Sequence, residues 1–340
     1  MPAFQPNAMT EPVLEPDLPI CDPHHHLWVR EGWPRYLLDD FAEDIREGGH
    51  RIEETVFVEA HAFYGHGRPK GFEYVAETEA MAGIAAMAES GAWGPTRICA
   101  GIVARAELEM GAAVAEVLEA HARAGAGRLR GIRASGAWHP GDAIRNSHTS
   151  PPQGLYAMAG FREGFAKLAG FGLSFEAWQY HTQIGEVIDL ARAFPDTAIM
   201  LNHVGGPLGI GPYKGRHEAV FPGWAADIRE IGKLPNVHVK LGGLGMPICG
   251  FDFHKRTTPP GSEELAAIWR PYLETCIEAF GMERAVFESN FPVDRTSCSY
   301  GVLWNAFKRI AAGCSAGEKA ALFRENALRF YRCALTAPRA

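Results

Sequence analysis

The sequence is organised around the stretch ICDPHHHLW, residues 20–28, an apolar run that ends in three consecutive histidines. Alternate side chains of a β-strand share one face, so we expect His24 and His26 on one side and His25 on the other. Asp22 is expected on the same face as His24 and His26. Such a group can hold a divalent metal or a substrate oxyanion. A His-x-His pair alone is also compatible with solvated histidines, so the rest of the chain must decide.

Length and composition narrow the class of protein. The chain has 340 residues, which suits one large α/β domain or two smaller ones. Its hydrophobic content of 47% is ordinary for a globular protein with a full core. The net charge of −7, from interspersed acidic and basic residues, argues against nucleic acid or an anionic membrane as the main partner. No apolar run approaches the roughly 20 residues that span a bilayer. We expect a small-molecule substrate.

The N-terminal segment and the cysteines bear on the setting of the protein. Residues 1–18 are rich in proline and have no apolar segment like that of a secretory signal. We interpret them as a mobile, extended arm that precedes one domain over residues 19–335. The seven cysteines are scattered without a CxxC spacing. This pattern is typical of buried free thiols in a reducing cytoplasm, so we predict a cytoplasmic protein.

Short apolar runs alternate with amphipathic segments along the chain. The predicted strands are residues 19–26, 55–60, 97–103, 129–134, 172–178, 198–204, 237–242 and 284–290. The predicted helices include residues 71–90, 107–124, 161–169, 184–193, 221–231, 262–280 and 315–333. Strands that alternate with helices imply a parallel sheet with right-handed crossovers. Eight such units, without an early GxGxxG turn, favour a (β/α)8 TIM barrel over a doubly wound sheet.

The connections differ in length on the two sides of the predicted strands. Those that leave strands are long and rich in Gly, Pro and His, as in residues 135–156, 205–222 and 243–261. Those that enter strands are short, as in residues 170–172 and 234–236. In a barrel the loops that leave the strands gather at the end where active sites are built. The alternative interpretation is that these loops are tolerated surface insertions.

Polar side chains at predicted strand ends are the candidate site residues, because such groups are costly in a barrel unless they are paired or used. His203 precedes Gly-Gly-Pro, which lets a ligand approach the backbone closely. Glu288 can hold or deprotonate a water, whereas Asn290 on the same strand face cannot act as a base. The simplest interpretation of Lys240 is an ion pair in the barrel wall.

Further residues are candidates for substrate binding, with packing, pairing or surface exposure as the alternative for each of them. They are Arg133, His148, Trp178, Tyr180 and His181. For Arg133 the alternative is a simple ion pair with Glu59.

Several motifs together resemble the amidohydrolase superfamily, specifically its amidohydrolase-2 branch of TIM-barrel hydrolases. That branch includes 2-pyrone-4,6-dicarboxylate lactonase and sugar-acid lactonases. The resemblance covers residue 20 to about residue 331. Its marks are DPHHHLW at 22–28, RGIR at 130–133, NHVGGP at 202–207, VKLGGL at 239–244 and ESNFPV at 288–293.

The resemblance implies a hydrolase of lactones or related esters that works with or without a metal. It implies that His24 and His26 bind a divalent metal or polarise the carbonyl, and that His203 assists. It also implies that Arg133 holds a substrate carboxylate, which suits its bidentate fork. His24, His26 and the carboxylate of Glu288 would be a sufficient catalytic set for zinc. We therefore predict either one divalent metal, with zinc as the candidate, or no metal.

The last strand departs from the family pattern, which usually reads Gly-Ser-Asp-Trp-Pro with the aspartate as the base that activates water. Here Asn290 stands in the place of that aspartate and Glu288 in the place of the glycine. Glu288 has taken over as the base, or Asn290 orients the nucleophile while another base works, or the usual hydrolysis is lost. We favour the first interpretation and predict Glu288, His203 and Asn290 as the catalytic group.

Our functional prediction is an enzyme in which activated water opens a lactone or ester of a small carboxylated or aromatic substrate, with the oxyanion stabilised by His24 and His26. One alternative is a non-hydrolytic lyase, such as a decarboxylase of an aromatic acid. The other is a non-catalytic ligand-binding barrel. The sequence leaves the substrate and the oligomeric state open, although barrels of this size often self-associate into homo-oligomers.

Overall fold

Eight parallel strands form one sheet in the computed structural model, which describes residues 11–333. They pair in sequence order and are β1 Ile20–His25, β2 Ile52–Val58, β3 Arg97–Arg105, β4 Leu129–Ser135, β5 Ser174–Trp178, β6 Ile199–Leu201, β7 Val237–Leu241 and β8 Ala285–Phe287. The end of β8 returns to β1, because Asn290 N donates to His24 O at 2.9 Å and His26 N donates to Phe291 O at 2.7 Å. The predicted (β/α)8 TIM barrel is confirmed.

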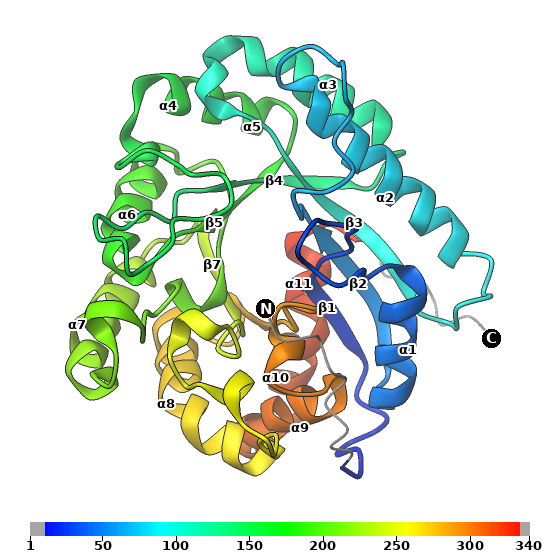
Figure 1. Ribbon diagram of the computed structural model, residues 1–340, viewed down its shortest axis with the longest axis vertical. Coiled ribbons are helices and arrows are strands. Elements are labelled where there is room, and N and C mark those ends of the chain that lie inside the picture. Colours follow the sequence, from blue (N-terminus) through cyan, green and yellow to red (C-terminus); the bar gives the residue numbers. More distant parts are fainter. Residues whose placement is uncertain (1–10, 334–340) are drawn as a thin grey trace.

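Helices surround the strands (Figure 1). They are α1 Leu38–Gly48, α2 Val75–Ala88, α3 Val114–Ala124, α4 Ala159–Phe165, α5 Lys167–Gly170, α6 Ile184–Ala193, α7 His217–Ile231, α8 Ser262–Phe280, α9 Tyr300–Ile310, α10 Ala316–Ala320 and α11 Asn326–Phe330. Two of them, α1 and α9, are absent from the helices predicted above. The predicted segment 315–333 is divided, because a π-helical turn over Ala321–Glu325 separates α10 from α11.

Strands β6 and β8 are shorter than predicted. Backbone φ angles of 52° at His203 and 54° at Asn290 place both residues in the left-handed region, which extended strands do not use. The chain therefore leaves the sheet just before these two residues. As a consequence, His203 and Glu288 lie in the turns that follow β6 and β8, at the end of the barrel where the loops leave the strands.

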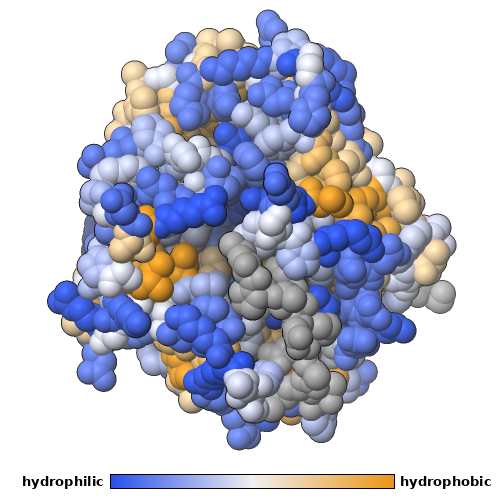
Figure 2. Space-filling model, viewed as in Figure 1, coloured by the Kyte–Doolittle hydropathy of each residue, from blue (hydrophilic) through white to orange (hydrophobic). Residues whose placement is uncertain are grey.

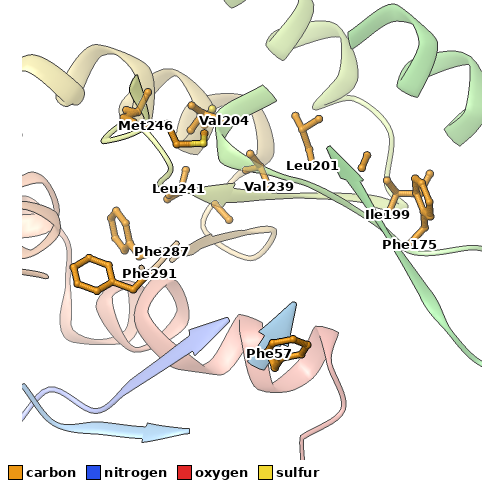
Figure 3. Close-up of a cluster of buried hydrophobic side chains, with 14 of the residues drawn as sticks. Phe57, Phe175, Ile199, Leu201, Val204, Val239, Leu241, Met246, Phe287 and Phe291 are labelled. Atoms are coloured by element: carbon orange, nitrogen blue, oxygen red, sulfur yellow. The ribbon is translucent and has the colours of Figure 1, made fainter. Parts of the chain in front are cut away.

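The hydrophobic core has two layers, because successive strand residues point to opposite faces. Between strands and helices lie large apolar side chains such as Phe175, Leu201, Leu241 and Phe287 (Figure 3). Inside the barrel lies a smaller cluster that includes Cys21, Val56, Val58, Met200 and Val286. The apolar residues of α11 and Tyr331 join this inner cluster, and α11 packs against β1 and β8 (Figure 1). The C-terminal helix therefore closes one end of the barrel.

Residues 11–18 lie against the helical layer. Glu11 Oε1 accepts a hydrogen bond from Ser262 N at 2.7 Å at the start of α8. Lys308 Nζ on α9 donates to Leu14 O at 2.7 Å and to Glu15 O at 2.8 Å. Over these residues the arm predicted to be mobile is thus hydrogen-bonded to the barrel. Residues 1–10 and 334–335 lie outside the described residues, and the domain boundary at residue 18 stays a prediction.

Within residues 11–333, every helix is too short or too polar to cross a membrane. The face shown in Figure 2 is largely hydrophilic, and its hydrophobic residues form separate patches. All seven cysteines are free, and six of them are buried, as predicted.

Candidate active site

A β-bulge in β1 decides which of its side chains face the barrel interior. The pairing with β2 passes from Asp22–Thr55 to His25–Phe57, so β1 contains one extra residue in this interval. Such a bulge bends a strand and breaks the simple alternation of its faces. Asp22 turns toward β8, where its carboxylate accepts hydrogen bonds from Ser289 N at 3.0 Å and Ser289 Oγ at 2.6 Å. The expectation that Asp22 lies on the face of His24 and His26 is therefore wrong.

The two outer histidines of the motif meet inside the barrel. His24 and His26 have their Nε2 atoms 3.2 Å apart. His26 Nδ1 lies 2.8 Å from Val58 O. Burial lowers the pKa of both rings well below the usual histidine range, and the Lys240 ammonium adds to the effect on His24. His25 points the other way, as predicted, and its ring stacks on Phe41.

Glu288 connects His24 in β1 with His203, which follows β6. Its Oε1 lies 2.6 Å from His203 Nδ1, and its Oε2 lies 2.8 Å from His24 Nδ1. The residue is fully buried, and burial raises its pKa to about 8. Within the described chain its Oε2 has no hydrogen bond of good geometry. A carboxyl group that changes protonation near neutral pH beside two imidazoles is suited to general acid–base chemistry.

Two glycines at the end of β7 make room for this contact. A Cβ atom on Gly242 would lie 2.5 Å from Glu288 Cγ, and one on Gly243 would lie 2.5 Å from the His203 ring. Gly243 also has a φ of 70°, a backbone conformation that residues with a side chain rarely adopt. The Gly-Gly step in the VKLGGL motif is therefore needed for His203 and Glu288 to reach each other.

A buried polar network that the sequence did not predict lies next to His24. Lys240 Nζ is 2.7 Å from Glu176 Oε2 and 3.1 Å from His24 Nδ1. Glu176 also accepts hydrogen bonds from Asn202 Nδ2 and Tyr331 OH. The predicted ion pair of Lys240 is confirmed, but its contact with the site was missed. The sequence feature that could have revealed this contact is the position of Lys240 between the outward-facing residues Val239 and Leu241. Because strand side chains alternate, this position directs the Lys240 side chain inward.

Arg133 forms an ion pair with the buried Glu59 carboxylate. Its Nε donates to Glu59 Oε1 at 2.8 Å and its Nη2 donates to Glu59 O at 2.5 Å. Burial would raise the pKa of Glu59, but Arg133 and His148 more than offset this and hold it well below its usual range. The Nε2 atom of His148 lies 3.4 Å from Glu59 Oε2. The pairing of Arg133 with Glu59 is thus observed, and substrate binding by Arg133 and His148 stays a prediction.

The other predicted substrate-binding residues lie at the end of β5 and in the connection that follows it. Trp178 packs edge-on against His203, with ring centres 4.8 Å apart. Tyr180 OH donates to Arg145 O. His181 Nδ1 accepts a hydrogen bond from Leu208 N at 3.2 Å. The structure therefore places Trp178 next to His203, whereas Tyr180 and His181 are hydrogen-bonded to other loop residues.

Asn290 contacts an acid that the sequence did not place. Its Nδ2 donates to Asp294 Oδ1 at 2.8 Å, and Asp294 Oδ2 accepts from Gly245 N at 2.9 Å. Burial raises the pKa of Asp294 to about 8. Among the hydrogen bonds of residues 11–333, none joins the Asn290 side chain to His24 or His203. Its catalytic role stays a prediction.

The cluster fits a divalent metal by the chemistry of its donors. One ligand atom each from His24, His203 and Glu288 lies within 4.8 Å of the others. Nitrogen and carboxylate oxygen donors suit zinc. Glu288 Oε2 has no hydrogen bond of good geometry although it lies 2.8 Å from His24 Nδ1, which is a further sign that this carboxylate can take a ligand. This set differs from the predicted His24, His26 and Glu288, because His203 takes the place of His26.

Protein cations lie beside this candidate metal centre. Lys240 Nζ is 3.1 Å from His24 Nδ1, and Arg133 Nη1 is 3.3 Å from His24 Nε2. A metal cation bound through His24 would therefore be repelled by the positive charges of Lys240 and Arg133.

A second buried acid behind the site gives a stability prediction. Glu77 on α2 accepts hydrogen bonds from Ala60 N at 3.2 Å and Ala62 N at 2.8 Å, and burial raises its pKa to about 8. The folded state then keeps a proton that the unfolded chain loses near pH 4. The contribution of Glu77 to the free energy of unfolding therefore falls as the pH rises toward 8. We expect Glu77→Gln to gain stability over the wild-type protein by about 1.4 kcal/mol for each pH unit between about 5 and 8.

Urea unfolding at several pH values measures this difference. Glu79→Gln on the same helix is the matched control, because Glu79 is exposed and paired with Arg68, and its pKa is lowered. A constant difference between Glu77→Gln and the wild-type protein across this pH range would contradict the prediction.

The chain is similar to known proteins over most of its length. A family model described as amidohydrolase matches residues 21–333. The uncharacterized protein y4mH of Sinorhizobium fredii is 33% identical over 337 residues, which cover 93% of this chain and 99% of that protein. An L-fucono-1,5-lactonase of Burkholderia multivorans is 26% identical over 174 residues, or 51% of this chain and 56% of the lactonase.

Solved structures share the fold. An amidohydrolase from Burkholderia multivorans, determined with bound HEPES and with bound zinc, has a TM-score of 0.68 and 22% identity over 92% of this chain and 99% of its own. A putative 2-pyrone-4,6-dicarboxylic acid hydrolase from Pseudomonas putida has a TM-score of 0.61 and 19% identity over 94% and 99% of the two chains. A 5-carboxyvanillate decarboxylase from Sphingomonas paucimobilis has a TM-score of 0.53 and 14% identity over 93% and 99%.

Proposed function

The chain belongs to the amidohydrolase family, and from this we propose that it is a hydrolase that opens a lactone or ester of a small carboxylated or aromatic substrate. The observation that carries the proposal is the buried Glu288 carboxyl group held between His24 and His203. The names of two kinds of relative, the L-fucono-1,5-lactonases and the 2-pyrone-4,6-dicarboxylic acid hydrolases, support lactones as the substrate class. The free buried cysteines support a cytoplasmic location.

In the proposed reaction Glu288 moves the proton. Its ionised form takes a proton from a water as the water oxygen attacks the carbonyl carbon of the lactone. His203 holds the Glu288 carboxylate through the 2.6 Å contact, and His24, beside His26, donates to the oxygen on which negative charge develops. When the ring C–O bond breaks, Glu288 returns the proton to the leaving oxygen. The product is the open-chain hydroxy acid, and Glu288 is ionised again.

A divalent metal would be held by His24, His203 and Glu288, and when bound it supplies Lewis acidity at the carbonyl oxygen and lowers the pKa of a bound water. Trp178 beside His203 would exclude water from one side of the substrate. Arg133, His148, Tyr180 and His181 remain the proposed residues for the rest of the substrate.

The test is a panel of sugar-acid lactones, carboxylated 2-pyrones and aryl esters, incubated with the purified protein with and without added zinc. We expect at least one lactone to gain the mass of one water and to release acid. A Glu288→Gln sample prepared in the same way shows whether the activity belongs to this site. Tight binding without turnover across the panel would instead favour a ligand-binding barrel.

A non-hydrolytic lyase is the second candidate function, because a 5-carboxyvanillate decarboxylase has a similar fold. Incubation with carboxylated phenols and measurement of released carbon dioxide separates the two reactions, since hydrolysis adds water and releases no carbon dioxide.

A further inference from the structure

A chain of buried polar side chains runs from the closed end of the barrel up to His24. It starts at Tyr331, whose hydroxyl donates to Glu176. Glu176 holds the Lys240 ammonium at 2.7 Å, and Lys240 Nζ in turn lies 3.1 Å from His24 Nδ1. Glu176, Lys240, His24 and Tyr331 all have a side chain that is fully buried. The proposed reaction above gives no task to the first three members of this chain.

The proton on His24 can be placed by working outward from His26. His26 Nδ1 lies 2.8 Å from the carbonyl oxygen of Val58, which can only accept, so Nδ1 carries the hydrogen and Nε2 is bare. A hydrogen on His24 Nε2 can bond to the bare His26 Nε2 at 3.2 Å, whereas a bare His24 Nε2 can accept from Arg133 Nη1 at 3.3 Å, so these contacts allow either tautomer of His24. The Lys240 ammonium, which can only donate, lies 3.1 Å from His24 Nδ1 and therefore favours the neutral ring with a bare Nδ1 and the hydrogen on Nε2.

We propose that Lys240 is a positioning residue that fixes the proton of His24 on Nε2 and so presents His24 to the site as a hydrogen-bond donor. Glu176 and Tyr331 hold the Lys240 ammonium in place. The proposal concerns the metal-free protein and rests on the proposed function only in the role that it gives to His24.

Lys240 then also opposes metal binding through His24. Coordination by His24 Nε2 requires the proton to move to Nδ1, where it would point at Glu288 Oε2 at 2.8 Å but also at the Lys240 ammonium. Two adjacent hydrogen-bond donors repel each other, and the ammonium also repels the dication. Removal of the Lys240 charge should therefore make zinc bind more tightly.

The test variant is the double substitution Lys240→Met with Glu176→Gln. Lys240→Met alone would leave the Glu176 carboxylate buried without its counterion, which is strongly destabilising. The double substitution removes both charges at similar volume. Its matched control is Arg324→Met with Glu54→Gln, because Glu54 is also buried and Arg324 Nη2 contacts its Oε1 at 2.8 Å, away from the histidines.

Nitrogen-15 NMR of histidine-labelled, chelator-treated protein reads the tautomer directly, with the His24 signals assigned by their loss in His24→Gln. In the wild-type protein we expect an unprotonated Nδ1 and a protonated Nε2. In Lys240→Met/Glu176→Gln we expect the pattern to reverse, because Nδ1 can then donate to Glu288 Oε2 at 2.8 Å while Nε2 accepts from Arg133 Nη1 at 3.3 Å. The control pair should keep the wild-type pattern. A protonated Nδ1 in the wild-type protein overturns the proposal, and that measurement stands even if the variant does not fold.

Zinc affinity, measured by competition with a chromophoric chelator, is the second readout. We expect the double variant to bind zinc about tenfold more tightly than the wild-type protein or the control pair. Equal affinities would contradict the proposal. If no substrate in the panel is opened, the proposed function fails, but both readouts still test the role of Lys240.

Discussion

Glu288→Gln is expected to lower kcat by about 10²- to 10⁴-fold on a substrate that the wild-type protein hydrolyses, the range that general acid–base groups supply. The amide has the size of the carboxyl group but cannot take a proton from water. Because burial raises the pKa of Glu288 to about 8, the group is largely neutral at pH 7, and the fold should tolerate a neutral amide. We therefore expect kcat to fall while KM and the urea midpoint stay close to those of the wild-type protein.

The matched control for this experiment is Asp44→Asn. Asp44 is another buried carboxyl group with a raised pKa, but it lies on α1, where it accepts a hydrogen bond from Tyr36 OH at 2.6 Å. Its substitution should leave kcat unchanged and affect only stability. Full turnover by Glu288→Gln would show that another group is the base, and the interpretation that Glu288 replaces the family aspartate would be wrong.

Asn290→Asp, which restores the residue type usual in the family, is expected to destabilise this protein by on the order of 3 kcal/mol at neutral pH or above. The new carboxylate would lie against Asp294 Oδ1, which now accepts from Asn290 Nδ2 at 2.8 Å. Both positions are buried, so two carboxylates there can ionise only at high cost. The loss should grow as pH rises, because each carboxyl group prefers to keep its proton in the folded state.

The exchange Asn290→Asp with Asp294→Asn is the rescue. The amide introduced at position 294 would turn its oxygen to Gly245 N and its nitrogen to the new carboxylate, so every hydrogen bond of this group is kept. Urea unfolding should place the double variant near the wild-type protein and well above Asn290→Asp. If Asn290→Asp proves as stable as the wild-type protein, the contact with Asp294 is unimportant for the fold.

The barrel itself could be predicted from the sequence, because its evidence is local. Apolar runs of strand length recur eight times, and polar side chains such as His203 and Glu288 interrupt them at one end only. The predicted ends of β6 and β8 were less accurate, because an apolar run does not indicate that His203 and Asn290 have left-handed φ angles. The candidate metal set was inferred from the His-x-His spacing, which says nothing of the distance between strands β1 and β6.

The polar network could not be predicted for the same reason. Tyr331 and Glu176 are 155 residues apart in the chain, and no spacing rule joins them. The bulge in β1 was also hidden, because strand periodicity assumes an uninterrupted register and so placed Asp22 beside His24. Arg133 shows a different limit. Binding of a substrate carboxylate and pairing with Glu59 both use its guanidinium group, so the sequence could not decide between them. The structure shows that the group is paired with Glu59.

The position of α11 has a consequence for biosynthesis. Tyr331 comes after all eight strands in the chain, yet its hydroxyl supports the ion pair that touches His24 in the first strand. Because synthesis proceeds from the N-terminus, the eighth strand leaves the ribosome before the helix that closes the barrel. The nascent protein can therefore pair all its strands while the Lys240 side chain still lacks part of its support. Any stop codon shortly before Tyr331 would release an incomplete catalyst.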